Sequence, residues 1–295
     1  MWFIFAFISQ ALWSFNNVVD KYILTNKLRD PSSYNILTML FDIVPISLYL
    51  LILPVNFSPA LILGVFAGLL TVVALQLFNE GIMKEEASRM VSLVYTSPIF
   101  VVFMSVIFLN EVVTFNNYLG IGLVVIGAIL ISTKNSGHKL VLSKIVVIAL
   151  LSAFVFALST ILSDSGLGYM TYWQFWFWAC FGSFIGALIM LIHPVLRKKF
   201  KRSMESIRLK TLGLAFLTCI VFYIAQLSFF FAISMGPVSL VASVLSLEPL
   251  VTLVFATLVT IYNPKLVREI INKNEFSKKL VAIVLSLVGV YLITA

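Results

Sequence analysis

Four polar side chains share one face of the first apolar segment of the chain. Trp13, Asn16, Asn17 and Asp20 have the spacing i, i+3, i+4 and i+7, which places them on one side of a helix. An asparagine amide supplies both hydrogen-bond donors and acceptors, so this face suits a neutral or zwitterionic solute. The alternative is that the amides hold two helices together through hydrogen bonds worth about 0.6–2 kcal/mol each. We interpret this face as the lining of a substrate cavity.

Two carboxylic acids lie deep inside apolar segments. Glu248 lies about ten residues, or ~15 Å, along its segment, and Asp42 lies equally deep in another one. A charge in hydrocarbon costs roughly 2.5–3.5 kcal/mol on insertion scales, so the presence of each acid calls for a structural or functional explanation. We expect Glu248 to be protonated or hydrogen-bonded, which suits an acid that couples transport to protons, and Asp42 is the second candidate. The alternatives are a bond from Glu248 to carbonyls that Pro249 frees, and a structural interface role for Asp42.

Polar stripes with helical spacing occur in other apolar segments as well. One stripe lies in residues 87–109 and is repeated in 238–262, and its members are Ser88, Ser92, Tyr95, Ser239, Ser243 and Ser246. Small residues at such positions also let helices approach closely, so the pattern leaves binding and packing open. Gln76, and Tyr223 with Gln226, add deep polar side chains in two further segments. The predicted substrate-binding residues are Trp13, Asn16, Asn17, Gln76, Ser92, Tyr95, Tyr223, Gln226 and Ser243.

The elements that carry these residues are those of a membrane protein. Of the 295 residues, 61% are hydrophobic and 11% are charged, which is more apolar surface than a water-soluble domain of this length can cover. Lipid solvates apolar side chains, while each helix satisfies its own backbone hydrogen bonds. The predicted fold class is therefore all-α, with ten transmembrane helices. Their predicted limits are 2–24, 32–53, 59–82, 87–109, 116–133, 144–164, 169–193, 210–235, 238–262 and 278–294.

The basic residues predict the orientation of these helices. All 20 Lys and Arg residues fall in the loops that follow odd-numbered helices. The positive-inside rule places those loops in the cytoplasm and both termini outside.

Because topology accounts for the net charge of +8, no nucleic-acid partner is predicted. The expected partners are a small-molecule substrate and the lipid bilayer of the plasma membrane, and a homodimer is left open. Residues 1–24 are expected to be a retained helix, since a secretory signal would begin with basic residues.

The two halves of the chain share a sequence pattern. Setting Pro98 opposite Pro249 aligns the two serine stripes. After an insertion in the second half, VIGAILI at 125–131 also aligns with LVGVYLI at 287–293. Each half holds five predicted helices, an odd number, so the copies insert with opposite orientations, as in many secondary transporters. The predicted units are a first five-helix repeat at 1–135 and a second at 143–295. Glycines with GxxxG spacing, Gly64/Gly68 and Gly182/Gly186, indicate close helix contacts.

These repeated blocks resemble a known family. The block SLVYTSPIFVVFMSVIFLNEVVT with GIGLVVIGAIL, and its counterpart VSLVASVLSLEPLVTLVFATL, resemble the EamA-type modules of the drug/metabolite transporter superfamily. The resemblance implies ten helices, traffic of amino acids or other metabolites, and a cavity lined mainly by the first, third, fourth, sixth, eighth and ninth. The chain departs from the pattern in two ways. Glu111 has no counterpart after the ninth helix, and the charges predict external termini where better-known members have cytoplasmic ones.

Other classes of protein fit the sequence less well. Cys180 and Cys219 lie inside apolar runs without metal-ligand spacing, so no metal or cofactor is predicted. The chain contains no P-loop motif, which excludes an autonomous ATP-driven pump, and no HExxH or GxSxG motif, which argues against an intramembrane enzyme. We predict a non-enzymatic secondary transporter that moves an amino acid or similar polar or amphipathic solute by alternating access, with proton coupling left open. An intramembrane enzyme and a non-transporting membrane subunit are the alternatives.

Overall fold

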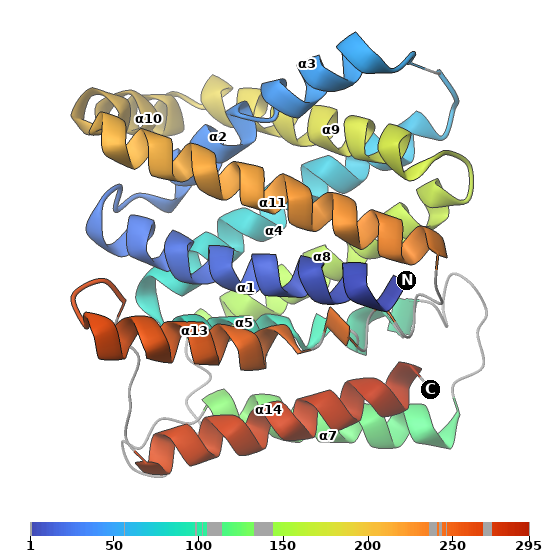
Figure 1. Cartoon of the computed structure of the whole chain (residues 1–295), viewed down its shortest axis with the longest axis vertical. Helices are drawn as coiled ribbons and strands as arrows, with labels where there is room; N and C mark the ends of the chain where they lie inside the picture. Colours follow the sequence, from blue (N-terminus) through green and yellow to red (C-terminus); the bar gives the residue numbers. More distant parts are fainter. Residues whose placement is uncertain are drawn as a thin grey trace.

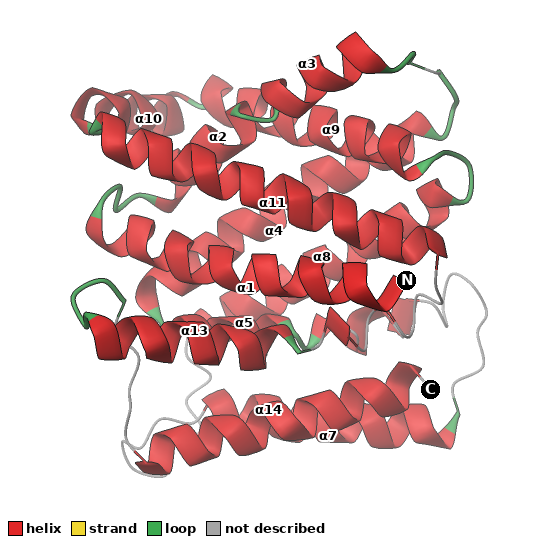
Figure 2. Cartoon of the chain, viewed as in Figure 1, coloured by secondary structure: helices red, strands yellow, loops and turns green. Residues whose placement is uncertain are grey.

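The computed structural model shows a layered bundle of helices (Figure 1). It describes residues 2–55, 57–97, 99–101, 103–104, 114–132, 144–235, 241, 244–245, 247–267 and 273–294. Within these ranges every regular element is a helix, in agreement with the predicted all-α class (Figure 2). The helices are α1 (Trp2–Asn26), α2 (Pro31–Leu40), α3 (Ile43–Ile52), α4 (Leu61–Lys84), α5 (Ala87–Val94), α7 (Phe115–Ser132), α8 (Lys144–Leu167), α9 (Tyr172–Ile192), α10 (Pro194–Ser206), α11 (Leu209–Met235), α13 (Glu248–Tyr262) and α14 (Lys273–Thr294).

Six helical segments in the described part of the chain are long and apolar enough to cross a membrane. They are Trp2–Asn26, Pro31–Ile52, Leu61–Lys84, Lys144–Leu167, Tyr172–Ile192 and Leu209–Met235. These segments match the first, second, third, sixth, seventh and eighth predicted crossings. Shorter apolar helices, Tyr118–Gly127 and Glu248–Tyr262, lie within the fifth and ninth. The count of ten crossings therefore stays a prediction.

The second predicted helix is broken in the middle. α2 ends at Leu40 and α3 begins at Ile43, which leaves Asp42 at the break. Pro45 explains this, because a proline lacks the N–H for a bond to the carbonyl four residues earlier, and its ring clashes with that carbonyl. The carbonyl of Phe41 instead accepts a bond from the Val44 N–H at 2.9 Å. The break places the Asp42 side chain inside the fold, where it is 4% exposed.

Helices from both halves of the chain interleave. α4 packs against α8 and α9, α1 packs against α11, and α7 pairs with α14 at one edge of the bundle (Figure 1). The N- and C-terminal ends lie at the same end of the helices, and α10 lies at the opposite end. α10 is a surface helix, with no buried residue, in a segment predicted to be a loop. Its first residue is Pro194, and proline suits the first position of a helix because that N–H has no intrahelical partner.

Buried ionic contacts hold the turn between α4 and α5. The ammonium of Lys21 donates hydrogen bonds of 2.6 Å to the backbone carbonyls of Ile82 and Glu85. Lys279 of α14 forms an ion pair of 2.6 Å with Glu86, and the two side chains are only 5% and 11% exposed. Charged groups at this depth persist when they are paired or bonded to carbonyls. The turn is thereby tied to α1 and to α14.

Candidate functional site

Glu248 is bound by neutral groups from two helices of the other half of the chain. The residue begins α13 and is 5% exposed. Its carboxylate accepts a hydrogen bond of 2.7 Å from the amide of Asn17 on α1, and another from the hydroxyl of Tyr95 at the end of α5. The Ser14 hydroxyl donates to the Glu248 backbone carbonyl at 3.2 Å. The Glu248 side chain therefore links α1, α5 and α13.

The helix that carries Glu248 begins at this residue. The sequence predicted one continuous helix through 238–262. In the structure α13 begins at Glu248, with Pro249 in its first turn, where proline is tolerated. The Glu248 side chain contacts Tyr95, a member of the stripe in the first half of the chain. Ser243, predicted to bind substrate, lies outside the described residues.

The chemistry of this contact suits proton exchange. An ionised carboxylate accepts from both Asn17 and Tyr95, whereas a protonated one can still accept from Asn17 and donate to the Tyr95 oxygen. None of the ion pairs between described residues involves Glu248, and its described partners are neutral. Glu248 can thus gain or lose a proton without losing its neighbours.

A second polar cluster joins α1, α2 and α11. Asn16 donates through its amide to the Thr218 carbonyl at 3.0 Å. The Tyr34 hydroxyl donates to the carboxylate of Asp20 and lies 3.3 Å from the Thr218 hydroxyl. Trp13, on the same face of α1, packs its ring against Phe222 and Phe229 of α11. The predicted polar face of α1 is therefore divided between two neighbours, because Asn17 meets α13 whereas Asn16 meets α11.

A third cluster surrounds Asp42. Its carboxylate accepts a hydrogen bond from the hydroxyl of Ser183 on α9. The Tyr223 hydroxyl of α11 also lies beside the Asp42 carboxylate. Asp42 therefore lies between a helix break in the first half of the chain and two helices of the second half. This placement is compatible both with an interface role and with a site for a proton.

The described hydrogen bonds of Gln76, Gln226 and Ser92 go to groups other than Glu248. The Gln76 amide donates to Ser32 at 3.1 Å and to Glu80 at 3.0 Å, within the first half. The Gln226 carbonyl oxygen accepts from the indole of Trp176 at 2.9 Å. Ser92 donates to the carbonyl of Ser88 in its own helix at 2.8 Å. The structure distributes the predicted residues over several clusters along the bundle.

Three hydroxyl residues of these clusters were not predicted. Ser14 lies three residues before Asn17, so its helical spacing was a usable signal. Thr218 and Ser183 are single hydroxyl residues in apolar helices. Such residues commonly bond to their own helix, so a lone hydroxyl carries no distinct sequence signal.

Comparisons with known proteins give a family and a fold. The family described as "EamA-like transporter family" matches residues 1–133 and 143–295. No curated protein matches the chain. Solved structures match as well, and one described only as "Crystal structure of protein" has a TM-score of 0.63 at 14% identity. That match covers 97% of this chain and 94% of the other. At this identity the likeness establishes the fold alone.

Proposed function

Since the chain belongs to the EamA-like transporter family, we propose that it is a secondary transporter for a small polar or amphipathic metabolite. It moves the solute across the plasma membrane by alternating access, with proton exchange at Glu248. The observation that carries this proposal is the buried Glu248 carboxylate, which belongs to one half of the chain and is bound by neutral donors of the other half. When an acid in that position gains or loses a proton, its hydrogen bonds to the other half change, and so does the contact between the halves.

The helix contacts support two related halves. In the predicted order, α4 is the third helix of the first half and α11 is the third helix of the second half. In the same way, α1 and α8 are the first helices of the two halves. Exchanging the halves therefore converts the α4–α8 pair into the α11–α1 pair, and both pairs pack in the structure. α5 and α13 are the fourth helices of the two halves, and α7 and α14 are the fifth. The members of each of these pairs pack against each other. This pattern is the one expected from a two-fold relation between the units 1–135 and 143–295. Because each unit has five predicted crossings, the relation is an inversion.

Unpaired polar atoms support a solute path between α1 and α11. Among the residues that the structure describes, the buried Trp13 indole N–H and Asn16 carbonyl oxygen have no hydrogen-bond partner, and neither has either polar atom of Gln10. Such an atom costs about 1–3 kcal/mol and is rare in folded proteins, so each one calls for a partner. Donors and acceptors are both present, which fits a polar solute that bonds them in another state of the transport cycle.

Reconstituted vesicles test the proposed function. A thermal-shift screen of amino acids, sugars, nucleosides and organic cations on the purified protein identifies solutes that stabilise it. We expect vesicles loaded with such a solute to take up its labelled form by exchange, and to take up more when a pH gradient is imposed. Protein-free vesicles are the control. Failure of every stabilising solute to exchange would contradict the proposal.

Tyr95→Phe is expected to slow uptake by about tenfold. The substitution keeps the ring and removes one donor to the Glu248 carboxylate, and a hydrogen bond to a charged group contributes about 1.5–3 kcal/mol. The initial rate of uptake into vesicles is the measurement. Tyr118→Phe on α7 is the matched control, because the Tyr118 side chain is exposed. Equal rates for the two variants would remove Tyr95 from the mechanism.

The topology is tested by reporters at the two ends of the bundle. α10 and the chain ends lie at opposite ends of the helices (Figure 1), and the basic residues of α10 predict a cytoplasmic position for it. We expect alkaline phosphatase, which is active only outside the cytoplasm, to be active when fused after Ala295 and inactive when fused after Ser206. The reverse pattern would contradict the proposed orientation.

A further inference from the structure

α10 lies at a membrane surface, because it connects the ends of two helices that are long and apolar enough to cross a membrane. α9 ends at Ile192 and α10 begins at Pro194, so a single residue separates them. α10 ends at Ser206, and α11 begins at Leu209. The thirteen residues of α10 therefore lie where these two helices leave the bilayer, at the end of the bundle opposite the chain termini (Figure 1).

One side of α10 packs against the protein. Phe200 and Met204, which are one helical turn apart, are partly buried against the main hydrophobic core. The helix as a whole contacts α2 and α9. Lys199 forms an ion pair of 3.9 Å with Asp30, the residue that caps α2. These contacts hold α10 against the bundle and determine which of its sides faces outward.

The outward side of α10 is basic. Lys198, Lys201 and Arg202 have the spacing i, i+3 and i+4, which places them together on the side away from the core, and all three are exposed. We call this surface the basic face. None of the ion pairs between described residues involves these three side chains. α10 contains five basic residues and one acid, Glu205, so its charge is strongly positive.

Exposed apolar side chains lie at both ends of α10. Ile192 is 74% exposed, Val195 is 55% exposed and Leu209 is 82% exposed. Such side chains are more stable in hydrocarbon than in water, whereas an ammonium or guanidinium group is costly in hydrocarbon. A segment that exposes both kinds within a few residues lies at the boundary between them, where the lipid headgroups are.

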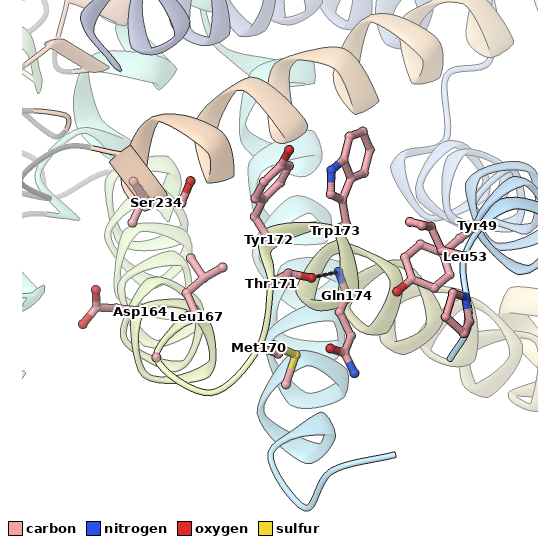
Figure 3. A pocket seen from close by; sticks show the side chains of 13 residues that line it. Tyr49, Leu53, Asp164, Leu167, Met170, Thr171, Tyr172, Trp173, Gln174 and Ser234 are labelled. Atoms are coloured by element: carbon pink, nitrogen blue, oxygen red, sulfur yellow. Dashed lines mark hydrogen bonds between the residues drawn. The ribbon is translucent and has the colours of Figure 1, made fainter. Parts of the chain in front are cut away.

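The opposite end of the bundle has a cavity of about 840 Å³ that offers no basic side chain. It lies between the end of α3, the turn between α8 and α9, and the end of α11 (Figure 3). All of its lining residues are described, and none of them is a lysine or an arginine. Tyr172 and Trp173 line it at the first turn of α9, as aromatic residues commonly do at a membrane interface. Attraction of phosphate is therefore expected at α10 and not at this cavity.

We propose that the basic face of α10 binds the headgroups of anionic phospholipids. Phosphate oxygens accept hydrogen bonds from the ammonium groups of Lys198 and Lys201, and the planar guanidinium of Arg202 can bond two of these oxygens at once. The acyl chains of the same lipids lie against the exposed apolar side chains at the ends of the helix, such as Val195. The inference concerns a surface outside the Glu248 site, so it does not depend on the proposed transport.

Lipid binding to the full-length protein tests the proposal. The purified, delipidated protein in detergent is titrated with dioleoylphosphatidylglycerol or with dioleoylphosphatidylcholine, and native mass spectrometry counts the bound lipid molecules. A basic side chain near anionic headgroups strengthens binding by roughly fivefold. We therefore expect phosphatidylglycerol to bind at least about tenfold more tightly than phosphatidylcholine. The triple variant with Lys198→Gln, Lys201→Gln and Arg202→Gln is expected to lose most of this preference.

A second triple variant removes the same charge from other exposed lysines. It carries Lys84→Gln, Lys144→Gln and Lys265→Gln, all outside α10, and is expected to keep the preference for phosphatidylglycerol. An equal loss in both variants would show that net charge alone attracts the lipid, and would overturn the proposal. Unchanged preference in the α10 variant would also overturn it.

Glycerol phosphate, which has the phosphate of the headgroup without acyl chains, separates a lipid from a free phosphate. We expect it not to displace phosphatidylglycerol. Displacement at the concentrations at which the lipid itself competes would assign the basic face to free phosphate and overturn the proposal.

A spin label measures the depth of α10 without changing the basic face. Val195→Cys is labelled with a nitroxide in vesicles that contain phosphatidylglycerol, and the control is the protein without this substitution, whose Cys180 and Cys219 are buried. We expect the nitroxide to collide more often with oxygen, which concentrates in hydrocarbon, than with a water-soluble nickel complex. The reverse order would place α10 in water, away from the lipid headgroups, and would overturn the proposal.

Discussion

Glu248→Gln is expected to reduce pH-driven uptake to the level of protein-free vesicles. Glutamine has the size of glutamate and keeps a carbonyl oxygen for the Asn17 amide, while its own amide N–H can donate to the Tyr95 oxygen. The packing around the site is therefore preserved. Glutamine cannot bind or release a proton, so the response of uptake to an imposed pH gradient disappears. Initial uptake rates at a series of pH gradients measure this.

The control for this variant is Glu205→Gln, which neutralises an exposed acid on α10 and is expected to keep the full pH response. Exchange in the absence of a pH gradient separates two roles of Glu248. Retained exchange in Glu248→Gln assigns Glu248 to coupling alone, whereas loss of both activities assigns it to solute binding as well. An unchanged pH profile in Glu248→Gln would discard Glu248 as the coupling acid.

The positions of most long helices could be predicted because each one needs its own run of apolar residues. α1 was predicted at 2–24 and is Trp2–Asn26, and α11 was predicted at 210–235 and is Leu209–Met235. The break in the second helix was missed although Pro45 was visible, since an apolar run does not show where its backbone hydrogen bonds fail. Hydrophobicity predicts that a segment is buried in lipid, but not whether it is one helix or two.

The buried acids were predicted, but their partners were not. Periodicity placed Asn16 and Asn17 on one face of α1, and the structure confirms that both are buried there. Which helix each one meets depends on packing between segments more than 200 residues apart, since Asn17 bonds to Glu248 and Asn16 to Thr218. A helical pattern in one segment contains no information about the neighbour that covers it. The contacts of Asp42 with Ser183 and Tyr223 are of the same kind.

The glycine spacing is an instance in which sequence and packing agree. The GxxxG glycines of α4 and α9 lie in the contact between these two helices, where each one meets atoms of the other helix at close range. A methyl group on Gly182 would overlap the Val65 carbonyl oxygen and lie 2.8 Å from the Val65 carbonyl carbon. A methyl group on Gly68 would overlap the carbonyl oxygen of Ala179 in the same way. These obstacles are backbone atoms, so rotation of a side chain cannot relieve the overlap.

Gly182→Ala is therefore expected to destabilise the protein by about 1–3 kcal/mol or more, because α4 and α9 must separate to admit the methyl group. The midpoint of thermal unfolding in detergent and the yield of monodisperse protein both measure this. Gly213→Ala on α11 is the matched control, since a methyl group there meets nothing within 4 Å. Alanine favours a helix over glycine by about 0.8–1 kcal/mol, so Gly213→Ala is expected to be neutral or slightly stabilising. Equal unfolding midpoints for the two variants would show that α4 and α9 do not meet through these glycines. A lower midpoint for Gly182→Ala alone would locate the contact between the two halves of the chain along this helix pair.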